Sequence, residues 1–388
     1  MRAAQTPIVS GSRAKRKALL ALVVAAVAIT VMAQSAAARP GPGPGPPGPK
    51  PGPTPRGFIG GFRHIDTVAS TVPANGDINP YGVAVAPVSD GRLVKGDVLV
   101  SNFNASSNEQ GTGTTIVEIS PRGNVSLFAS LDPNNLPGLC PGGVGLTTAL
   151  AVLKSGWVVA GSLPTSDGTS ATAQAGCLIV LDSSGKPVMT VAGPKINGPW
   201  DLTALDRGDT ADLLVTNVLD GTVVRVDLRN LESRHAPAVA SETTIASGFA
   251  HHPDPAALEV GPTGVGLSTN GTLYVADSAA NRIASIDDAA VKRSHSRDVK
   301  TVSSGGNLND PLGLAVTPNG DILTTNGGDG NLVETTPAGK QVAVRVLDNT
   351  AVQGAPNGNG TLFGLALTLR ADGIYFVDDG SNTLDLLH

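Results

Sequence analysis

The residues best placed to do chemistry are carboxylates and amides that flank short apolar segments. Asp201 ends the segment Asn197-Gly198-Pro199-Trp200-Asp201, at a position where five related segments of the chain have Gly or Ala. A carboxylate in an apolar strand is costly unless water, hydrogen bonds or a metal ion compensate its charge. Asp201 is therefore either a functional group that faces a ligand or a carboxylate satisfied by neighbouring backbone amides.

Oxygen donors near Asp201 could bind a cation. Asn197 precedes it, and Asn79 and Asn309 occur near the start of related segments, which suggests a ring of amides, although each is also a plausible turn residue. Such oxygens suit Ca²⁺, so Asp201 and Asn197 are candidate ligands of Ca²⁺ or another divalent cation. Trp200 could stack on a ligand or seal a gap in the core.

A second candidate is the loop His251-His252-Pro253-Asp254, which holds two of the six histidines. Imidazole and carboxylate groups ligate zinc, so His251 and Asp254 are candidate ligand-site residues. Adjacent side chains on an extended backbone point in opposite directions, and a solvated loop is the alternative. The chain has no G-x-S-x-G, H-E-x-x-H or G-x-x-x-x-G-K motif.

The elements that must position these residues form a repeat with six copies. Each copy has a strand with small residues at two alternating positions, then an apolar strand that ends in Asn, Asp or Ser, then two further strands. The small positions lie 49 to 67 residues apart from one copy to the next. The pairs are Gly82/Ala84, Ala149/Ala151, Asp201/Thr203, Gly264/Gly266, Gly313/Ala315 and Gly364/Ala366. Four strands at this spacing are typical of propeller blades.

We therefore predict an all-β fold, a six-bladed β-propeller with four-stranded blades over residues 57–388. Small residues are expected where the innermost strands of neighbouring blades converge. The sixth copy is one strand short when the chain ends at His388. Residues 63–69 can supply that strand, which would close the ring and leave no open sheet edge.

The first 56 residues predict export. Residues 1–38 combine four basic residues between positions 13 and 17, an apolar run from Ala18 to Ala33, and a small-residue cleavage region that ends at Ala38. This is the pattern of a secretory signal peptide, with an uncleaved membrane anchor as the alternative. Residues 39–56 form a Pro/Gly-rich linker. We expect a secreted or periplasmic protein, with no membrane insertion after cleavage.

The predicted export also determines which states of the two cysteines are expected. Cys140 and Cys177 can form a disulfide in an oxidising compartment, with two buried thiols as the alternative.

The chain has 27 Lys and Arg residues, of which eight precede residue 57, and all 32 Asp and Glu residues follow it. The formal net charge of residues 57–388 is thus −13. Such a surface repels phosphate backbones, so nucleic-acid binding is not expected.

Two segments resemble the NHL repeat. They are Thr272-Leu-Tyr-Val-Ala-Asp277, with Asn281-Arg282-Ile283 after it and Pro262-Thr-Gly264 before it, and Pro311-Leu-Gly313-Leu-Ala-Val-Thr-Pro318-Asn-Gly-Asp321. The resemblance implies a propeller, and NHL-type propellers include protein-binding platforms, ligand-sensing domains and a zinc-dependent lyase. The regucalcin and gluconolactonase propellers are more distantly similar. They imply a metal-dependent lactonase, but the acidic ligand expected in the first inner strand is missing from Tyr81-Gly82-Val83-Ala84.

These observations favour a monomeric, non-catalytic binding module that recognises a protein, a glycan or a small molecule at the channel face. The candidate site residues are Asn79, Asn197, Trp200, Asp201, His251, Asp254 and Asn309. The alternative is a divalent-metal-dependent hydrolase or lyase, lactonase-like, with its site in the central channel around Asp201.

Overall fold

The computed structural model describes residues 57–233, 235–293 and 299–388. The predicted signal peptide (1–38) and linker (39–56) lie outside the described residues. Within the described part, no helix is both long and apolar enough to cross a lipid bilayer. The helical segments there are four short 3₁₀ turns, Phe58–Gly61, Pro133–Asn135, Ser170–Thr172 and Ser278–Ala280.

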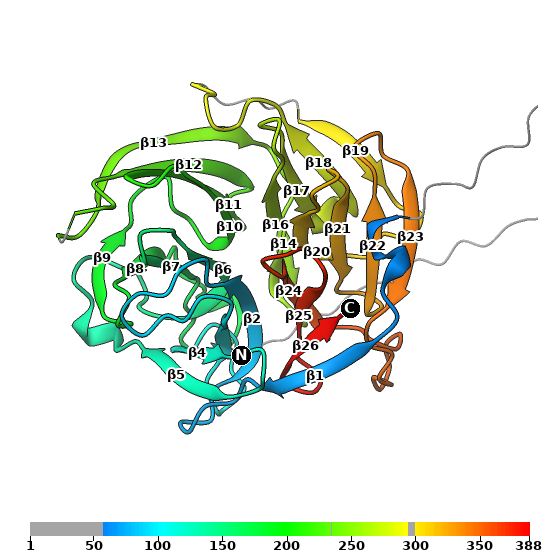
Figure 1. Ribbon diagram of the computed structural model, residues 1–388, viewed down its shortest axis with the longest axis horizontal. Coiled ribbons are helices and arrows are strands. Elements are labelled where there is room, and N and C mark those ends of the chain that lie inside the picture. Colours follow the sequence, from blue (N-terminus) through cyan, green and yellow to red (C-terminus); the bar gives the residue numbers. More distant parts are fainter. Residues whose placement is uncertain (1–56, 234, 294–298) are drawn as a thin grey trace, which may run out of the picture. The chain divides into compact units, whose positions relative to one another are not determined.

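Six four-stranded antiparallel sheets surround a common centre, which confirms the predicted six-bladed propeller (Figure 1). Blade one contains β2 (Ile78–Val85), β3 (Val98–Asn104), β4 (Thr115–Ile119) and β5 (Val125–Ser130). Blade two contains β6 (Leu146–Val152), β7 (Val158–Ser162), β8 (Cys177–Leu181) and β9 (Pro187–Val191). Blade three contains β10 (Pro199–Asp206), β11 (Thr210–Asn217), β12 (Thr222–Arg229) and β13 (Ala238–Ser247).

Blades four and five follow the same order. Blade four contains β16 (Pro262–Leu267), β17 (Leu273–Asp277), β18 (Arg282–Ile286) and β19 (Lys300–Ser304). Blade five contains β20 (Pro311–Val316), β21 (Ile322–Asn326), β22 (Asn331–Thr335) and β23 (Gln341–Val346). A two-stranded hairpin, β14 (His252–Asp254) and β15 (Leu258–Val260), is inserted between blades three and four.

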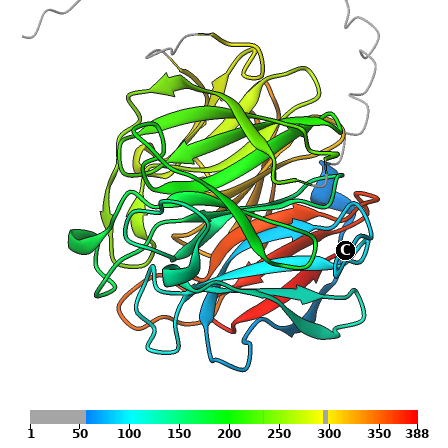
Figure 2. The ribbon, with the colours of Figure 1, turned by 90° about the vertical axis from the view of Figure 1, so that its left-hand side faces the viewer.

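The ring closes through strands from both ends of the propeller. Blade six contains β24 (Leu362–Leu367), β25 (Ile374–Asp378) and β26 (Thr383–Leu387), and its fourth strand is β1 (Ile65–Ser70). β1 pairs antiparallel with β26, from Ile65 opposite Leu387 to Ser70 opposite Thr383. The blue and red strands lie together in both views (Figures 1 and 2). The closure predicted from residues 63–69 is confirmed, with the strand starting two residues later.

The small residues of the inner strands are required by the backbone of the next blade. A Cβ atom at Gly313 would lie 2.1 Å from the carbonyl oxygen of Phe363, and one at Gly364 would lie 2.2 Å from that of Tyr81. Real Cβ atoms do not approach backbone oxygens so closely. The small pairs of the repeat therefore mark the positions where neighbouring blades touch.

Hydroxyl groups join successive blades near the centre. Thr147 Oγ1 in blade two donates to the Pro199 carbonyl of blade three (2.8 Å), and Thr216 Oγ1 in blade three donates to the Thr263 carbonyl of blade four (2.7 Å). Thr325 Oγ1 in blade five donates to the Phe363 carbonyl of blade six (2.7 Å). All three hydroxyls are buried, so each bond satisfies a donor and a carbonyl that water does not reach.

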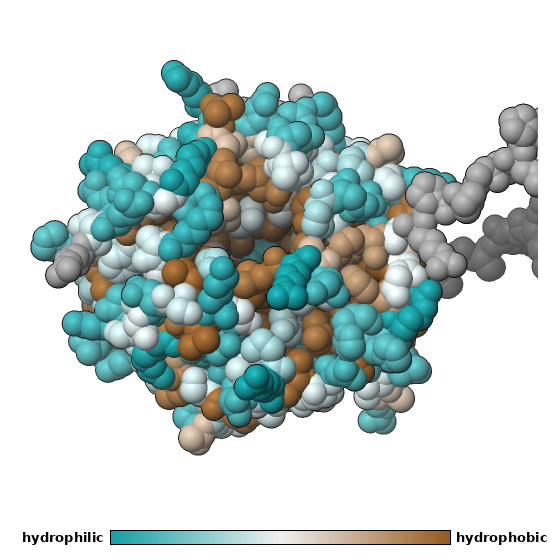
Figure 3. Space-filling view, viewed as in Figure 1, coloured by the Kyte–Doolittle hydropathy of each residue, from teal (hydrophilic) through white to brown (hydrophobic). Residues whose placement is uncertain are grey.

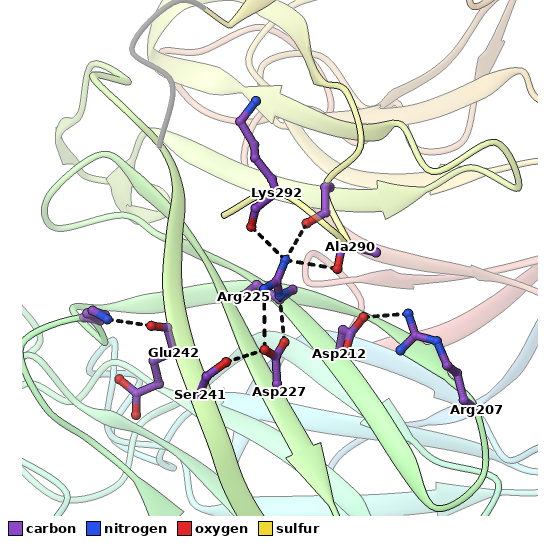
Figure 4. A network of polar contacts seen from close by, with 10 residues as sticks. Arg207, Asp212, Arg225, Asp227, Ser241, Glu242, Ala290 and Lys292 are labelled. Carbon is purple, nitrogen blue, oxygen red and sulfur yellow. Dashed lines mark hydrogen bonds and ion pairs between the residues drawn. The ribbon is translucent and has the colours of Figure 1, made fainter. Parts of the chain in front are cut away.

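Farther from the centre, an arginine connects blade three to blade four (Figure 4). Arg225 of β12 pairs with Asp227 (Nε to Oδ1, 2.7 Å). Its Nη1 donates to the carbonyl groups of Ala290 (3.0 Å) and Lys292 (2.9 Å), in the loop after β18. Because Arg225 is only 8% exposed, its charge needs these partners, and we assign it a structural role.

The disulfide between Cys140 and Cys177 is formed. It joins the segment before β6 to the first residue of β8, with a sequence separation of 37 residues. A covalent loop of that length stabilises a fold by about 3 to 4 kcal/mol on the chain-entropy model.

Candidate functional site

A cavity of about 350 Å³ occupies the centre of the ring, and we call it the channel. The first strands of all six blades line it, mostly with small or branched apolar side chains. Among the described residues that line it, Asp201 is the one ionisable residue, and Thr148 and Thr203 carry hydroxyl groups. Figure 3 shows a hollow at the centre of the molecule with hydrophobic residues around it.

One end of the channel is closed by an aromatic plug, formed by Tyr81, Phe103, Trp200 and Phe363. The Tyr81 ring stacks on Phe103 and on Phe363, with centroid distances of 4.3 and 3.9 Å, and lies 5.6 Å from Trp200. All four side chains are at most 1% exposed. The plug lies at the end where the inner strands begin. Its residues Tyr81, Trp200 and Phe363 directly precede the first positions of three of the small pairs of the repeat, which are Gly82, Asp201 and Gly364.

The β14–β15 hairpin covers this plug. Ala257 and Leu258 are buried in the same hydrophobic cluster as the plug residues. The Pro255 carbonyl accepts a hydrogen bond from Gln110 Nε2 (2.8 Å), and the Leu258 carbonyl accepts one from Ser170 Oγ (2.5 Å). The channel is therefore closed at the hairpin end, and its lining residues continue toward the opposite end of the inner strands.

Asp201 lies at the inner, closed end of the channel. Its Oδ1 accepts the backbone N–H of Leu202 (2.8 Å), and its Oδ2 accepts that of Val265 in blade four (2.9 Å). Burial raises the pKa of Asp201 to about 8, although these two hydrogen bonds act in the opposite direction. The residue as a whole is only 8% exposed. At neutral pH the channel thus presents mainly a neutral carboxylic acid.

The donors predicted to bind a cation with Asp201 do not meet there. Asn197 lies before β10, outside the residues that line the channel, and its backbone N–H donates to Asn217 Oδ1 (3.2 Å). Across residues 57–233, 235–293 and 299–388, no three His, Cys, Asp or Glu side chains are grouped so that they could hold a metal ion. The channel side chains do not fit the divalent cation of the alternative hypothesis.

The three predicted amides do not form a ring. Asn79 is 4% exposed and donates its backbone N–H to Asn382 Oδ1 (2.7 Å), while Asn309 is exposed and donates its amide to Asp329 Oδ2 (3.2 Å). They also differ in position relative to the first small-pair residue of their blade. Asn79 lies three residues before that residue, whereas Asn197 and Asn309 lie four residues before it. None of the three lines the channel.

A second group of predicted residues meets beside the hairpin. Asp254 and Asp310 both line two neighbouring cavities of about 180 and 410 Å³, which we call the hairpin cleft. The larger cavity is also lined by Asn309 and His252. His251 is exposed and lies outside both linings. The loop thus contributes Asp254 and the second histidine of the pair to the cleft.

Asp310 is the residue that sequence reasoning missed. It directly precedes β20 and adopts a left-handed backbone conformation, with φ of 55°. Burial and the charge of Asp254 raise the pKa of Asp310 to about 6, while His252 acts in the opposite direction. A signal was present, because blades three and four have Gly198 and Gly261 at this position and an acidic residue stands out there.

Comparison with known proteins supports the fold. No family model and no curated protein sequence matches the chain, so the NHL assignment stays a prediction. A gluconolactonase from Xanthomonas campestris has a similar structure, with a TM-score of 0.52 and 12% identity over 83% of this chain and 88% of its own. A luciferin-regenerating enzyme gives 0.52 and 11% identity, over 84% and 94%.

A virginiamycin B lyase from Staphylococcus aureus gives a TM-score of 0.48 and 13% identity, over 84% of this chain and 98% of its own. The structural similarity to the gluconolactonase and to the luciferin-regenerating enzyme supports a shared propeller architecture. The sequence identities of 12% and 11% are low. They do not carry an activity from one chain to another.

Proposed function

We propose that this protein is a binding module that holds a small molecule in the channel. The observation that carries the proposal is a central cavity that is closed at one end by the aromatic plug and has the buried carboxyl group of Asp201 at that end. Its volume of about 350 Å³ is that of a small-molecule site, since such sites range from about 300 to 1,000 Å³. A protein or glycan partner would be too large to enter it.

The lining suits binding better than catalysis. Small-molecule sites combine apolar walls with a few polar groups that fix the orientation of the ligand. The residues that line the channel are mostly apolar, but its accessible surface is mainly polar, and Asp201 and Thr203 are polar side chains in that lining. Both Asp201 oxygens already accept backbone N–H groups, which ties this carboxyl group to the scaffold and favours a role in positioning a ligand.

A channel-filling substitution should abolish binding. Ala204 lines the channel, so Ala204→Phe places a ring in the space that a ligand needs. Ligands found by screening a library of small molecules for increases in the unfolding temperature of the wild-type protein should give no increase with this variant, because binding stabilises the folded state by mass action.

The matched control is Val291→Phe, which adds the same ring at an exposed loop residue. Ligands should stabilise this variant as they stabilise the wild type. If they stabilise Ala204→Phe equally well, the binding site lies outside the channel. A library without a single ligand would leave the proposed function without support.

The hairpin cleft favours a second candidate function, hydrolysis. The observation is that Asp310, with a pKa of about 6, shares two cavities with Asp254. A carboxyl group that titrates near neutral pH can accept a proton from an attacking water molecule, and such general-base catalysis contributes about 10²- to 10⁴-fold to a rate. In this candidate function the hydrolytic site lies at Asp310 and Asp254, and not at Asp201.

Asp310→Asn tests this candidate. If the protein hydrolyses any compound in a panel of lactones and esters, the wild-type rate should rise as the pH passes about 6, because Asp310 becomes ionised. The variant should lose at least about 100-fold of the rate. Asp372→Asn, in an exposed turn, should keep the full rate. An equal rate for all three proteins would exclude Asp310 as the base.

A further inference from the structure

A second cavity, of about 550 Å³, lies beside the β14–β15 hairpin and shares no described lining residue with the channel. The hairpin forms one wall, and the loops that follow β3 and β7 form the rest. We call this cavity the proline groove, after Pro253 and Pro255 in its lining. We propose that it binds a primary ammonium compound with a cyclic aliphatic body, with the body against the two prolines and the ammonium group at Asp254.

Two hydrogen bonds fix the hairpin to the neighbouring blades. Gln110 Nε2, in the loop after β3 of blade one, donates to the Pro255 carbonyl (2.8 Å). Ser170 Oγ, in the loop after β7 of blade two, donates to the Leu258 carbonyl (2.5 Å). Leu258 is also buried in the hydrophobic cluster of the aromatic plug. The groove is therefore formed before a ligand enters, and binding does not have to order the hairpin.

The surface that a ligand can touch in the proline groove is mainly apolar, in contrast to that of the channel. Pro253, Pro255 and Ala171 line the groove and are exposed, so a molecule from solution can reach them. Their side chains are rigid or short, so they lose little conformational freedom when a ligand covers them. Each methylene of a ligand that leaves water there raises the affinity by up to about fourfold, which favours an aliphatic body.

Asp254 is the one ionisable residue among the described residues that line the groove. Its Oδ1 accepts the backbone N–H groups of Ala256 (2.7 Å) and Ala257 (3.0 Å), which fixes the direction of the carboxylate. Its Oδ2 accepts no hydrogen bond from the described part of the chain and is not one of the fully buried polar atoms. This oxygen is free to accept a hydrogen bond from an ammonium group, and such a charge-assisted bond is roughly twice as strong as a neutral one.

The segments that form the groove are acidic. Residues 105–113, 163–176 and 251–260 contain four acidic residues and no Lys or Arg. The acidic residues are Glu109, Asp167, Asp254 and Glu259. The basic side chains of these segments are those of His251 and His252, and imidazoles are mostly neutral above pH 7. Such a surface attracts cations and repels anions, so the groove favours an ammonium group over a carboxylate or phosphate group.

An NMR titration of the whole protein with four small compounds tests this inference. The compounds are cyclohexylmethylammonium, cyclohexylmethanol, cyclohexylacetate and methylammonium, at about pH 8, where imidazoles are normally neutral. The backbone amide signals of Ala256 and Ala257 report on the groove, because both N–H groups bond to Asp254. Cyclohexylmethylammonium should shift these signals with the highest affinity. The alcohol should bind about fivefold more weakly, and the carboxylate and methylammonium at least about tenfold more weakly.

Two Asp→Asn variants test the role of the charge. Asp254→Asn removes the charge and keeps a side-chain oxygen that can accept the N–H groups of Ala256 and Ala257. This variant should fold normally, bind cyclohexylmethylammonium about fivefold more weakly, and bind cyclohexylmethanol within about twofold of the wild type. Asp90→Asn makes the same change at an exposed residue outside the groove, and it should bind both compounds as the wild type does.

Two further variants locate the site, which does not depend on ligand binding in the channel. Ala171→Arg places a positive charge on an exposed wall of the groove and should weaken binding of cyclohexylmethylammonium at least about fivefold by repulsion. Ala204→Phe fills the channel and should bind the compound as the wild type does.

Three results would overturn the proposal. If Ala204→Phe abolishes binding, the compound occupies the channel and not the proline groove. If cyclohexylmethanol binds as tightly as cyclohexylmethylammonium, or if Asp254→Asn has no effect, the charge of Asp254 does not select the ligand. If no compound shifts the signals of Ala256 and Ala257, the groove is not a site for this class of ligand.

Discussion

A variant without residues 62–70 should give no soluble, cooperatively folded protein. β1 (Ile65–Ser70) is the fourth strand of blade six and pairs with β26 along its whole length. Its removal leaves the N–H and C=O groups of β26 unpaired at an open edge, and such an edge promotes aggregation. The deletion also removes the strand through which the chain of blade one is part of blade six, so the ring can open between these two blades.

Expression followed by thermal unfolding, monitored by circular dichroism, measures this effect. Thr67→Ala serves as a control, because Thr67 is exposed and its backbone can still pair with Asp385. This variant should unfold within a few degrees of the wild type. A deletion variant that is soluble and unfolds at the wild-type temperature would refute closure of the ring by β1.

The stability of the wild type should fall as the pH rises from about 4 to about 8, and Asp201→Asn should remove that part of the fall. Asp201 has a pKa raised to about 8 in the folded state, from 3.8 for an ordinary Asp. Between these values the folded state binds a proton that the unfolded state has lost, so deprotonation favours unfolding. One pKa unit corresponds to about 1.4 kcal/mol, and the full effect is on the order of 6 kcal/mol.

Urea unfolding at several pH values between 4 and 9 measures the slope. The Asn side chain has one oxygen in place of two, so Asp201→Asn loses one acceptor for a backbone N–H and about 1 kcal/mol at every pH. This constant cost does not alter the slope. Asp90→Asn, at an exposed residue, should keep the wild-type slope. Identical slopes for wild type and Asp201→Asn would show that Asp201 titrates as an ordinary carboxylate.

The architecture could be predicted from the sequence because its signal is local and repeated. Each blade needs small residues where its inner strand meets the next blade, so Gly264, Gly313 and Gly364 recur at regular spacing. The missing strand could be located because the sixth copy ends early. Cys140 and Cys177 could be paired because both flank strands that run in the same direction within one blade.

The closed end of the channel could not be predicted, because its parts are far apart in the sequence. Tyr81, Trp200 and Phe363 belong to blades one, three and six, and they meet only when the ring closes. In a single strand, an aromatic residue before a small residue is compatible with many environments. The sequence therefore suggested a ligand site at the hairpin end, where the structure has an aromatic plug and a covering hairpin.

The state of Asp201 also depended on contacts between blades. The sequence left two alternatives, a functional group or a carboxylate bonded to backbone amides, and the structure shows the backbone hydrogen bonds of the second alternative. Its oxygens accept N–H groups of Leu202 and of Val265 in the next blade, and the same side chain lines the channel. The hydrogen bond to Val265 spans 64 residues of sequence, so no local pattern encodes it.

The most direct test of ligand binding in the channel is a carbon-13 NMR titration of the Asp201 carboxyl group, assigned by comparison with Asp201→Asn. In the free protein this carbon should titrate near pH 8, and a saturating ligand from the stability screen should shift its resonance, because Asp201 lines the channel. A carboxyl carbon that titrates near pH 4 and does not respond to any bound ligand would contradict the assignment of the channel as the binding site.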